Sequence, residues 1–302
     1  MRAKVGAVAP WAGGKVRLAP QIAGLLGEHR IYAEPFCGGC SVLLAKPRAP
    51  LEYLNDLHGD LVNMILMMQE RPEAFERSLR PAVWCEHQFE LALEMLAEKG
   101  YTSDNPPEAE PGQVIYEHPF DYALRLELAV AAFRVWWMGA AGRAGMPLGS
   151  MSPALRFTTG GGTGARRYLS AVESIAAMGA RLEGVHVTRR DALELLGRLP
   201  DTDETAIYVD PPYALEGSLY AHHGTTPQQL AAVLGRFEQA RIVVSYYEDP
   251  QVFEAFEGWD FQRVEVGKPL AQVKAGERNG ARAVELLISK RCDRPRKTGG
   301  SA

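Results

Sequence analysis

The 302-residue sequence lacks the features that mark membrane, secreted and zinc-binding proteins. It contains no run of about 18 or more uncharged apolar residues, so we expect no membrane span. It shows no charged-then-apolar leader with a small-residue cleavage site, so we expect a cytoplasmic protein. The four cysteines include one close pair, Cys37 and Cys40, which no second pair or histidine cluster accompanies. We therefore expect reduced, buried cysteines and no metal, with a redox pair of Cys37 and Cys40 as the alternative.

Acidic residues are absent from one long segment of the chain. The formal net charge is −4, which argues against binding nucleic acid by bulk charge but leaves room for a local basic patch. No Asp or Glu occurs from residue 134 through residue 172. Five arginines fall in that segment: Arg134, Arg143, Arg156, Arg166 and Arg167. Such a patch suits phosphate groups.

Strand and helix signals alternate at both ends of the chain but not in its middle. The content of 46% hydrophobic and 23% charged residues is typical of a soluble globular protein. We expect one α/β domain made of residues 1–56 and 169–291, with a mainly helical insert at residues 57–168 and a disordered tail at residues 292–302. The last two strands of that domain, at residues 261–266 and 284–289, should pair antiparallel.

The most informative stretch is Ile-Tyr-Val-Asp-Pro-Pro-Tyr at residues 207–213. Its first three residues favour a strand, and the prolines must end it, because proline cannot donate to a sheet ladder. Asp210 and Tyr213 are thereby held at the carboxyl end of a strand, where open α/β sheets bind ligands. A simple turn with a capping aspartate is the alternative, and this stretch alone does not decide between the two.

Other strand ends carry similar groups. Residues 34–39, Glu-Pro-Phe-Cys-Gly-Gly, form a glycine-rich turn that is not a Gly-x-Gly-x-x-Gly fingerprint, which argues against a nicotinamide-dependent oxidoreductase. Asp56 closes a second strand about 20 residues on, where an acid can bond ribose hydroxyls. Asp191 closes a third strand, where it could reach an adenine amine. Each acid could be only a helix N-cap, but three such acids at three strand ends are harder to explain that way.

These motifs together resemble the Dam-type DNA adenine-N6 methyltransferases. The matching pieces are Trp-Ala-Gly-Gly-Lys at residues 11–15, the glycine turn at 34–39, Leu-Asn-Asp at 54–56 and Asp-Pro-Pro-Tyr at 210–213, in the order of that family. The resemblance spans most of the chain. It implies a Rossmann-like sheet of the S-adenosylmethionine-dependent methyltransferases, with the helical insert recognising DNA.

The resemblance also implies roles for individual residues. S-adenosylmethionine would lie across the strand ends, with Trp11 and Lys15 closing over it. Core packing for Trp11 and a solvated surface position for Lys15 are the alternatives, which the motif order makes less attractive. The residues implied in cofactor binding are Trp11, Lys15, Glu34, Phe36, Gly38, Asp56, Asp191 and Asp210.

The catalytic residues implied are Asp210, Pro211, Pro212 and Tyr213. Asp210 can accept one hydrogen of the adenine amine and the Pro211 carbonyl the other, which directs the nitrogen lone pair at the methyl group. Tyr213 offers a ring for stacking a base flipped out of the duplex. No metal and no covalent intermediate are required.

The insert would read DNA. Arg143 lies where the family often has a recognition-loop arginine, but the surrounding Asn-rich context is replaced here by residues 136–141, so no target sequence can be transferred. Arg166 and Arg167 follow a glycine-rich segment and are expected to contact phosphates; a solvated basic loop is the alternative.

We therefore expect a site-specific adenine methyltransferase acting on double-stranded DNA, a monomer in the cytoplasm of a bacterial cell or encoded by a phage. The alternatives left open are a cytosine-N4 or RNA-adenine methyltransferase and a non-catalytic DNA-binding protein with the same fold.

Overall fold

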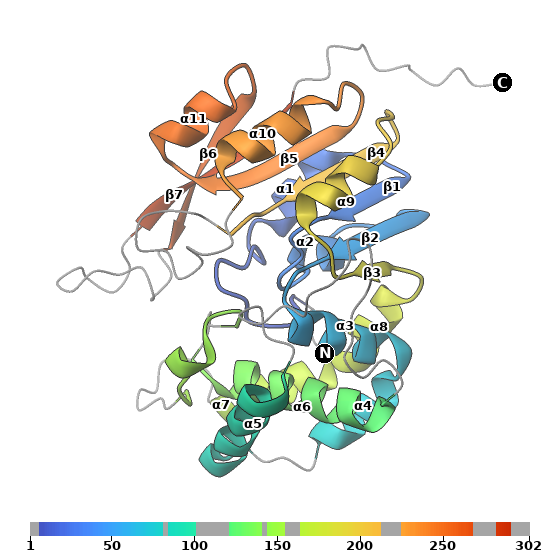
Figure 1. Cartoon of the computed structure of the whole chain (residues 1–302), viewed down its shortest axis with the longest axis vertical. Coiled ribbons are helices and arrows are strands. Elements are labelled where there is room, and N and C mark those ends of the chain that lie inside the picture. The colour runs from blue at the N-terminus through green and yellow to red at the C-terminus, as the bar shows by residue number, and fades with distance from the viewer. Residues whose placement is uncertain are drawn as a thin grey trace.

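The structure, a computed structural model, describes residues 6–80, 84–100, 121–140, 144–154, 164–212, 225–267 and 282–290 (Figure 1). Arg143, Tyr213 and the predicted tail at residues 292–302 lie outside the described residues. Within them the chain forms a sheet flanked by helices and, below it in Figure 1, a group of helices from the middle of the sequence.

The sheet has seven strands in the order β3-β2-β1-β4-β5-β7-β6. The first five run parallel, and β7 lies antiparallel between β5 and β6. This arrangement confirms the predicted Rossmann-like α/β sheet, and the two late strands pair antiparallel as expected. The strand bounds are Ile31–Glu34 (β1), Leu51–Asn55 (β2), His186–Thr188 (β3), Thr205–Val209 (β4), Arg241–Tyr247 (β5), Asp260–Gly267 (β6) and Arg282–Ser289 (β7).

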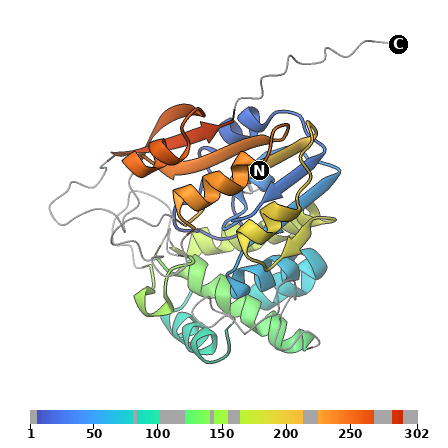
Figure 2. The same cartoon turned by 45° about the horizontal axis from the view of Figure 1, so that its top comes forward.

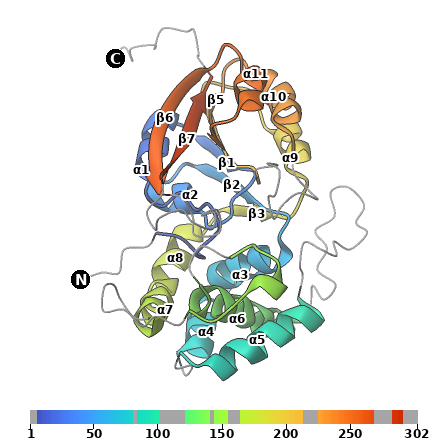
Figure 3. The same cartoon turned by 90° about the vertical axis from the view of Figure 1, so that its left-hand side faces the viewer.

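The sheet has a hydrophobic core on each face, and successive side chains along a strand pack into alternate cores because they point to opposite faces. Tyr208 packs with the residues of α1 (Ala19–Leu26) and α2 (Ser41–Ala45). Its neighbours Ile207 and Val209 pack on the other face. That face is covered by α9 (Ala192–Arg198), α10 (Pro227–Gly235) and α11 (Pro250–Ala255), as Figure 3 shows. The result is a three-layer α/β sandwich.

The middle of the chain folds around α6, which contacts α3, α4, α5 and α7. From Leu128 to Met138 nearly every side chain of α6 is buried, as expected of a central helix. Its core is continuous with the α1 and α2 face of the sheet, and Figure 2 shows these helices beneath the sheet. The bounds are Gly59–Glu70 (α3), Pro72–Leu79 (α4), Glu86–Lys99 (α5), Tyr122–Met138 (α6), Gly164–Glu173 (α7) and Ile175–Leu182 (α8), with a 3-10 turn at Leu148–Ser150.

The division into domains stays a prediction. The expected boundary at residue 168 falls inside α7, and α8, which follows it, packs on α3 and α4 of the helical part. Among the helices that the structure describes, none is long and apolar enough to cross a membrane.

Candidate active site

The candidate site lies where the parallel strands end. β4 stops at Val209, and Asp210 and the two prolines follow it, with Pro211 buried. The glycine turn at residues 34–39 starts at the last residue of β1, the neighbouring strand. Parallel strands present their carboxyl ends at one edge, so the motif residues meet there although they are far apart in the sequence.

Lys15 binds the carboxylate of Asp210, 195 residues away. Its Nζ lies 2.8 Å from Oδ1 and 2.9 Å from Oδ2 of Asp210, 3.0 Å from Oε1 of Glu285 and 2.7 Å from the carbonyl oxygen of Gly13. Burial alone would lower the pKa of Lys15, but the two carboxylates outweigh burial and raise this pKa. Lys15 is therefore a buried ammonium rather than a solvated surface lysine.

The Trp11 indole fills a space between two glycines. A Cβ on Gly38 would lie 2.7 Å from Cδ1 of Trp11, and one on Gly145 would lie 2.4 Å from Cζ2. The ring also makes edge contacts with His58 and Trp136, at centroid distances of 5.5 and 5.7 Å. The indole thus packs half-buried between the glycine turn and the helical part, while its contact with a cofactor stays a prediction.

Hydrogen bonds of the backbone also connect the segment around Trp11 to the helical part. Ala12 N donates to Ala144 O at 3.1 Å, and Trp11 forms an isolated parallel bridge with Ala144. Trp137 Nε1 donates to Val8 O at 3.2 Å. The loop that carries Lys15 is therefore attached to the helical part as well as to the sheet.

Asp56 lies beside the glycine turn. Its Oδ2 accepts from Gly38 N and its Oδ1 from His58 N, both at 3.0 Å. Burial raises the pKa of Asp56, although these amides oppose that rise. The φ of +43° at Gly38 is one that glycine adopts readily. The carboxylate is half-buried, so it can still meet a ligand at this edge.

Asn55, which sequence reasoning passed over as a site residue, joins three strand ends. Its Nδ2 donates to Pro35 O and Arg190 O, and its Oδ1 accepts from Thr188 Oγ1 and Arg190 N, at 2.8 to 3.0 Å. Asn55 is fully buried. An amide at the last position of a strand, directly before Asp56, was the available signal.

Glu34, predicted to bind cofactor, is buried and engaged by the protein. Its Oε1 accepts from Tyr32 Oη at 2.5 Å and from Leu43 N in the first turn of α2 at 2.7 Å. Burial raises the pKa of Glu34 to about 7, against the opposing effect of these hydrogen bonds. The contacts give Glu34 a part in holding α2 under the glycine turn, and its contact with a cofactor stays a prediction.

Two further predicted cofactor residues have protein partners. Asp191 is the N-cap of α9, where its Oδ1 accepts from Leu193 N at 2.9 Å and Glu194 N at 3.0 Å. Phe36 packs half-buried against the core on the α9–α11 face. Contact of Asp191 and Phe36 with a cofactor stays a prediction.

The two predicted phosphate contacts differ in environment. Arg166 is exposed at the start of α7. Arg167 is half-buried, and its Nη2 donates to the carbonyls of Trp137, at 2.7 Å, and Gly139, at the end of α6. Arg167 therefore holds the end of α6, where the carbonyls lack helical partners.

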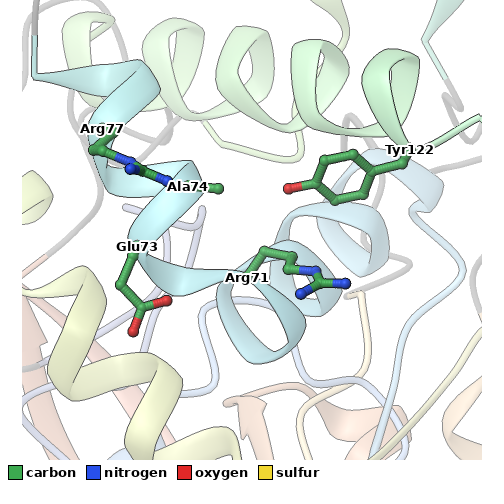
Figure 4. Close-up of a pocket in the computed structure, with 5 residues that line it drawn as sticks. All are labelled: Arg71, Glu73, Ala74, Arg77 and Tyr122. Atoms are coloured by element: carbon green, nitrogen blue, oxygen red, sulfur yellow. The ribbon is translucent and has the colours of Figure 1, made fainter.

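A separate pocket of about 340 Å³ lies in the helical part, between α4 and the start of α6 (Figure 4). The Arg71 guanidinium lies 5.9 Å from the centroid of the Tyr122 ring. None of the predicted site residues lines this pocket. The lining residues are Arg71, Glu73, Ala74, Arg77 and Tyr122.

The comparison with family models identifies one family. Residues 11–93 match the D12 class N6 adenine-specific DNA methyltransferases. The match begins at Trp11 and takes in Lys15, the glycine turn and Asp56, three of the four motifs. No curated protein matches the chain. In the part of the chain that the structure describes, no three His, Cys, Asp or Glu side chains gather to hold a metal. The first third of the chain is thus similar to the D12 class N6 adenine-specific DNA methyltransferases.

Proposed function

We propose that the protein transfers a methyl group from S-adenosylmethionine to the N6 amine of adenine at a specific sequence in duplex DNA, after the base is flipped out of the helix. The observation that carries this proposal is the carboxylate of Asp210 at the end of β4, directly before the carbonyl of buried Pro211 and held by Lys15. The protein acts as a monomer.

The residues at the strand ends fit S-adenosylmethionine. The half-buried Asp56 carboxylate is an acceptor suited to a ribose diol, and it lies beside the glycine turn after β1. When bound, S-adenosylmethionine supplies a methyl carbon whose bond to the sulfonium sulfur breaks as its bond to nitrogen forms, the sulfur keeping the bonding pair and the nitrogen then releasing a proton to water.

Asp210 and Pro211 position the amine. The adenine amine is a weak nucleophile because its lone pair is delocalised into the ring. Asp210 accepts one amine hydrogen and the Pro211 carbonyl the other, so the lone pair is freed and aimed at the methyl carbon. Lys15 fixes the orientation of the Asp210 carboxylate before the base arrives. Tyr213, outside the described residues, stacks on the flipped base in this proposal.

The helical part binds the duplex. Arg166 contacts a phosphate in this proposal. Its exposed position at the start of α7 supports this role. Arg143, outside the described residues, contacts a base edge. Arg167 acts in DNA binding only indirectly, because its guanidinium is bound to the carbonyls of Trp137 and Gly139.

Asp210→Ala tests this proposal. Purified protein is incubated with tritiated S-adenosylmethionine and duplex DNA, single-stranded DNA or RNA, and the labelled nucleoside is identified by chromatography and mass spectrometry. We expect N6-methyladenine in duplex DNA from the wild type, and a loss of roughly 100-fold or more in Asp210→Ala. The matched control is Asp203→Ala, an exposed acid just before β4 at its opposite end.

Asp203→Ala should keep the thermal unfolding midpoint of the wild type, whereas Asp210→Ala should lower it because buried Lys15 loses one of its two carboxylate partners, so activity is assayed well below both midpoints. Activity retained by Asp210→Ala would contradict the assigned chemistry. Methylcytosine as the product would show that the target base is cytosine. Preferred labelling of RNA would show that the substrate is RNA rather than duplex DNA.

A further inference from the structure

Glu285 reaches the same cluster from the antiparallel strand β7. It pairs in register with Tyr247 of β5 and Val264 of β6. Its side chain is about 5% exposed, and its Oε1 lies 3.0 Å from Lys15 Nζ. We propose that Glu285 is a positioning residue that compensates the charge of Lys15, so that the Asp210 carboxylate keeps its negative field for the adenine amine. This inference rests on the proposed function.

Geometry supports a fixed place for Lys15. An ammonium has three hydrogens to donate. The acceptors around Lys15 Nζ belong to three groups, the Gly13 carbonyl, the Asp210 carboxylate and the Glu285 carboxylate, all within 3.0 Å. Removing Glu285 leaves one donor without this acceptor and frees the ammonium to move fully onto Asp210.

Charge supports the same role. Lys15 and Asp210 alone would form a neutral pair, whereas adding Glu285 gives the three groups a net charge of one negative. The amine nitrogen becomes positively charged as it accepts the methyl group. The Asp210 carboxylate stabilises that charge only as far as Lys15 does not cancel its field, and Glu285 reduces this cancellation by compensating the charge of Lys15. Glu285 therefore acts on the reaction through Lys15.

A second buried carboxylate provides a matched comparison. Glu52, in β2, is 3% exposed and accepts from Lys46 Nζ at 2.5 Å and from Arg181 at 2.6 and 2.8 Å. It is as buried and as paired as Glu285, but it belongs to none of the contacts around Asp210. Replacing either acid by glutamine leaves a buried cation with one carboxylate fewer, so both variants lose stability for the same reason.

The experiment measures single-turnover methyl transfer and cofactor affinity in Glu285→Gln and Glu52→Gln. We expect Glu285→Gln to slow methyl transfer on the order of tenfold or more, with the calorimetric dissociation constant for S-adenosylmethionine changed by less than about threefold. Glu52→Gln should keep the wild-type rate. Equal rates in Glu285→Gln and the wild type, both active, would overturn the inference.

A double-mutant cycle with Lys15→Met separates positioning from a purely structural role. Since Glu285 acts through Lys15, adding Glu285→Gln to Lys15→Met should change the transfer rate by less than about threefold. This pair also removes both buried charges together, which favours folding over removing one alone. A further tenfold loss in the double variant would show that Glu285 acts on its own and would refute the inference.

A readout independent of activity is the acylation rate of Lys15, measured by mass spectrometry against pH. Loss of a compensating carboxylate lowers the pKa of the ammonium, so Lys15 should react faster in Glu285→Gln than in the wild type. An unchanged rate would count against the inference. If the wild type transferred no methyl group to DNA, the proposed function would fail, while this measurement would still report on the contact of Glu285 with Lys15.

Discussion

The carboxyl group of Glu34 should make the stability of this protein depend on pH in an unusual direction. Burial raises its pKa from 4.5 to about 7. The folded state therefore holds the proton more tightly than the unfolded state, so this group stabilises the fold fully below about pH 4.5 and loses that contribution as pH rises through 7. Because Glu34 is only 1% exposed, solvent screening is small, and the loss amounts to about 3 kcal/mol.

Glu34→Gln removes this dependence. The amide oxygen of glutamine can still accept from Tyr32 and Leu43, but it carries no charge at any pH. We expect the variant to gain about 3 kcal/mol relative to the wild type between pH 4.5 and pH 8.5. Urea unfolding followed by circular dichroism at several pH values measures the difference. All other titrating groups are shared, so the difference isolates Glu34.

Glu52→Gln is the control of opposite sign. Burial alone would raise the pKa of Glu52, but hydrogen bonds from Arg181 and Lys46 outweigh burial and lower this pKa. Its contribution is present above the unfolded pKa and is lost as pH falls. Glu52→Gln should therefore destabilise more at pH 8.5 than in acid. A Glu34→Gln difference that stays constant with pH would refute the reasoning about burial.

Three other predictions follow from the contacts. Gly145→Ala should destabilise by about 2–4 kcal/mol, measured by urea unfolding, because the new Cβ meets Trp11 and the residue has a φ of +83°; unchanged stability would contradict the packing of that indole. Asn55→Ala should lower the thermal midpoint by several degrees, on the order of 2 kcal/mol or more, because buried partners lose their hydrogen bonds; no change in midpoint would contradict this role. Arg166→Ala should reduce the salt slope of DNA binding by about 1 with the fold unchanged, in titrations at several salt concentrations, whereas an unaltered slope would mean that it touches no phosphate.

Local signals predicted those parts of the fold that depend on neighbouring residues. The prolines after Asp210 end β4. Helix α10 begins at the capping box of Thr226 and Gln229, where a threonine followed by a proline indicates a helix start. Residues 164–182 form two helices, α7 and α8, rather than one. They meet at Ser174, whose hydroxyl bonds the Ser170 carbonyl and competes with the helical backbone.

Contacts between distant residues could not be predicted in the same way. The pairing of Glu285 with Lys15 joins the two ends of the chain, and nothing in the sequence near either residue specifies it. The glycine at position 38 indicates a close approach, but only the fold shows that the approaching group is the Trp11 indole. The prediction that the strand ends meet at one edge of the sheet was correct, because this follows from parallel pairing. The partner of each side chain depends instead on packing across the core.

The position of Trp11 between Gly38 and Gly145 makes this ring a built-in optical probe. Indole emission depends on the polarity and rigidity of its surroundings, and this indole touches both the glycine turn after β1 and the segment after α6. If the helices shift against the sheet when a duplex is bound, the Trp11 ring must lose or change its contact with the glycine turn or with the segment after α6. The spectrum of the wild type minus that of Trp11→Phe would then record the shift in solution, in real time and without an attached dye.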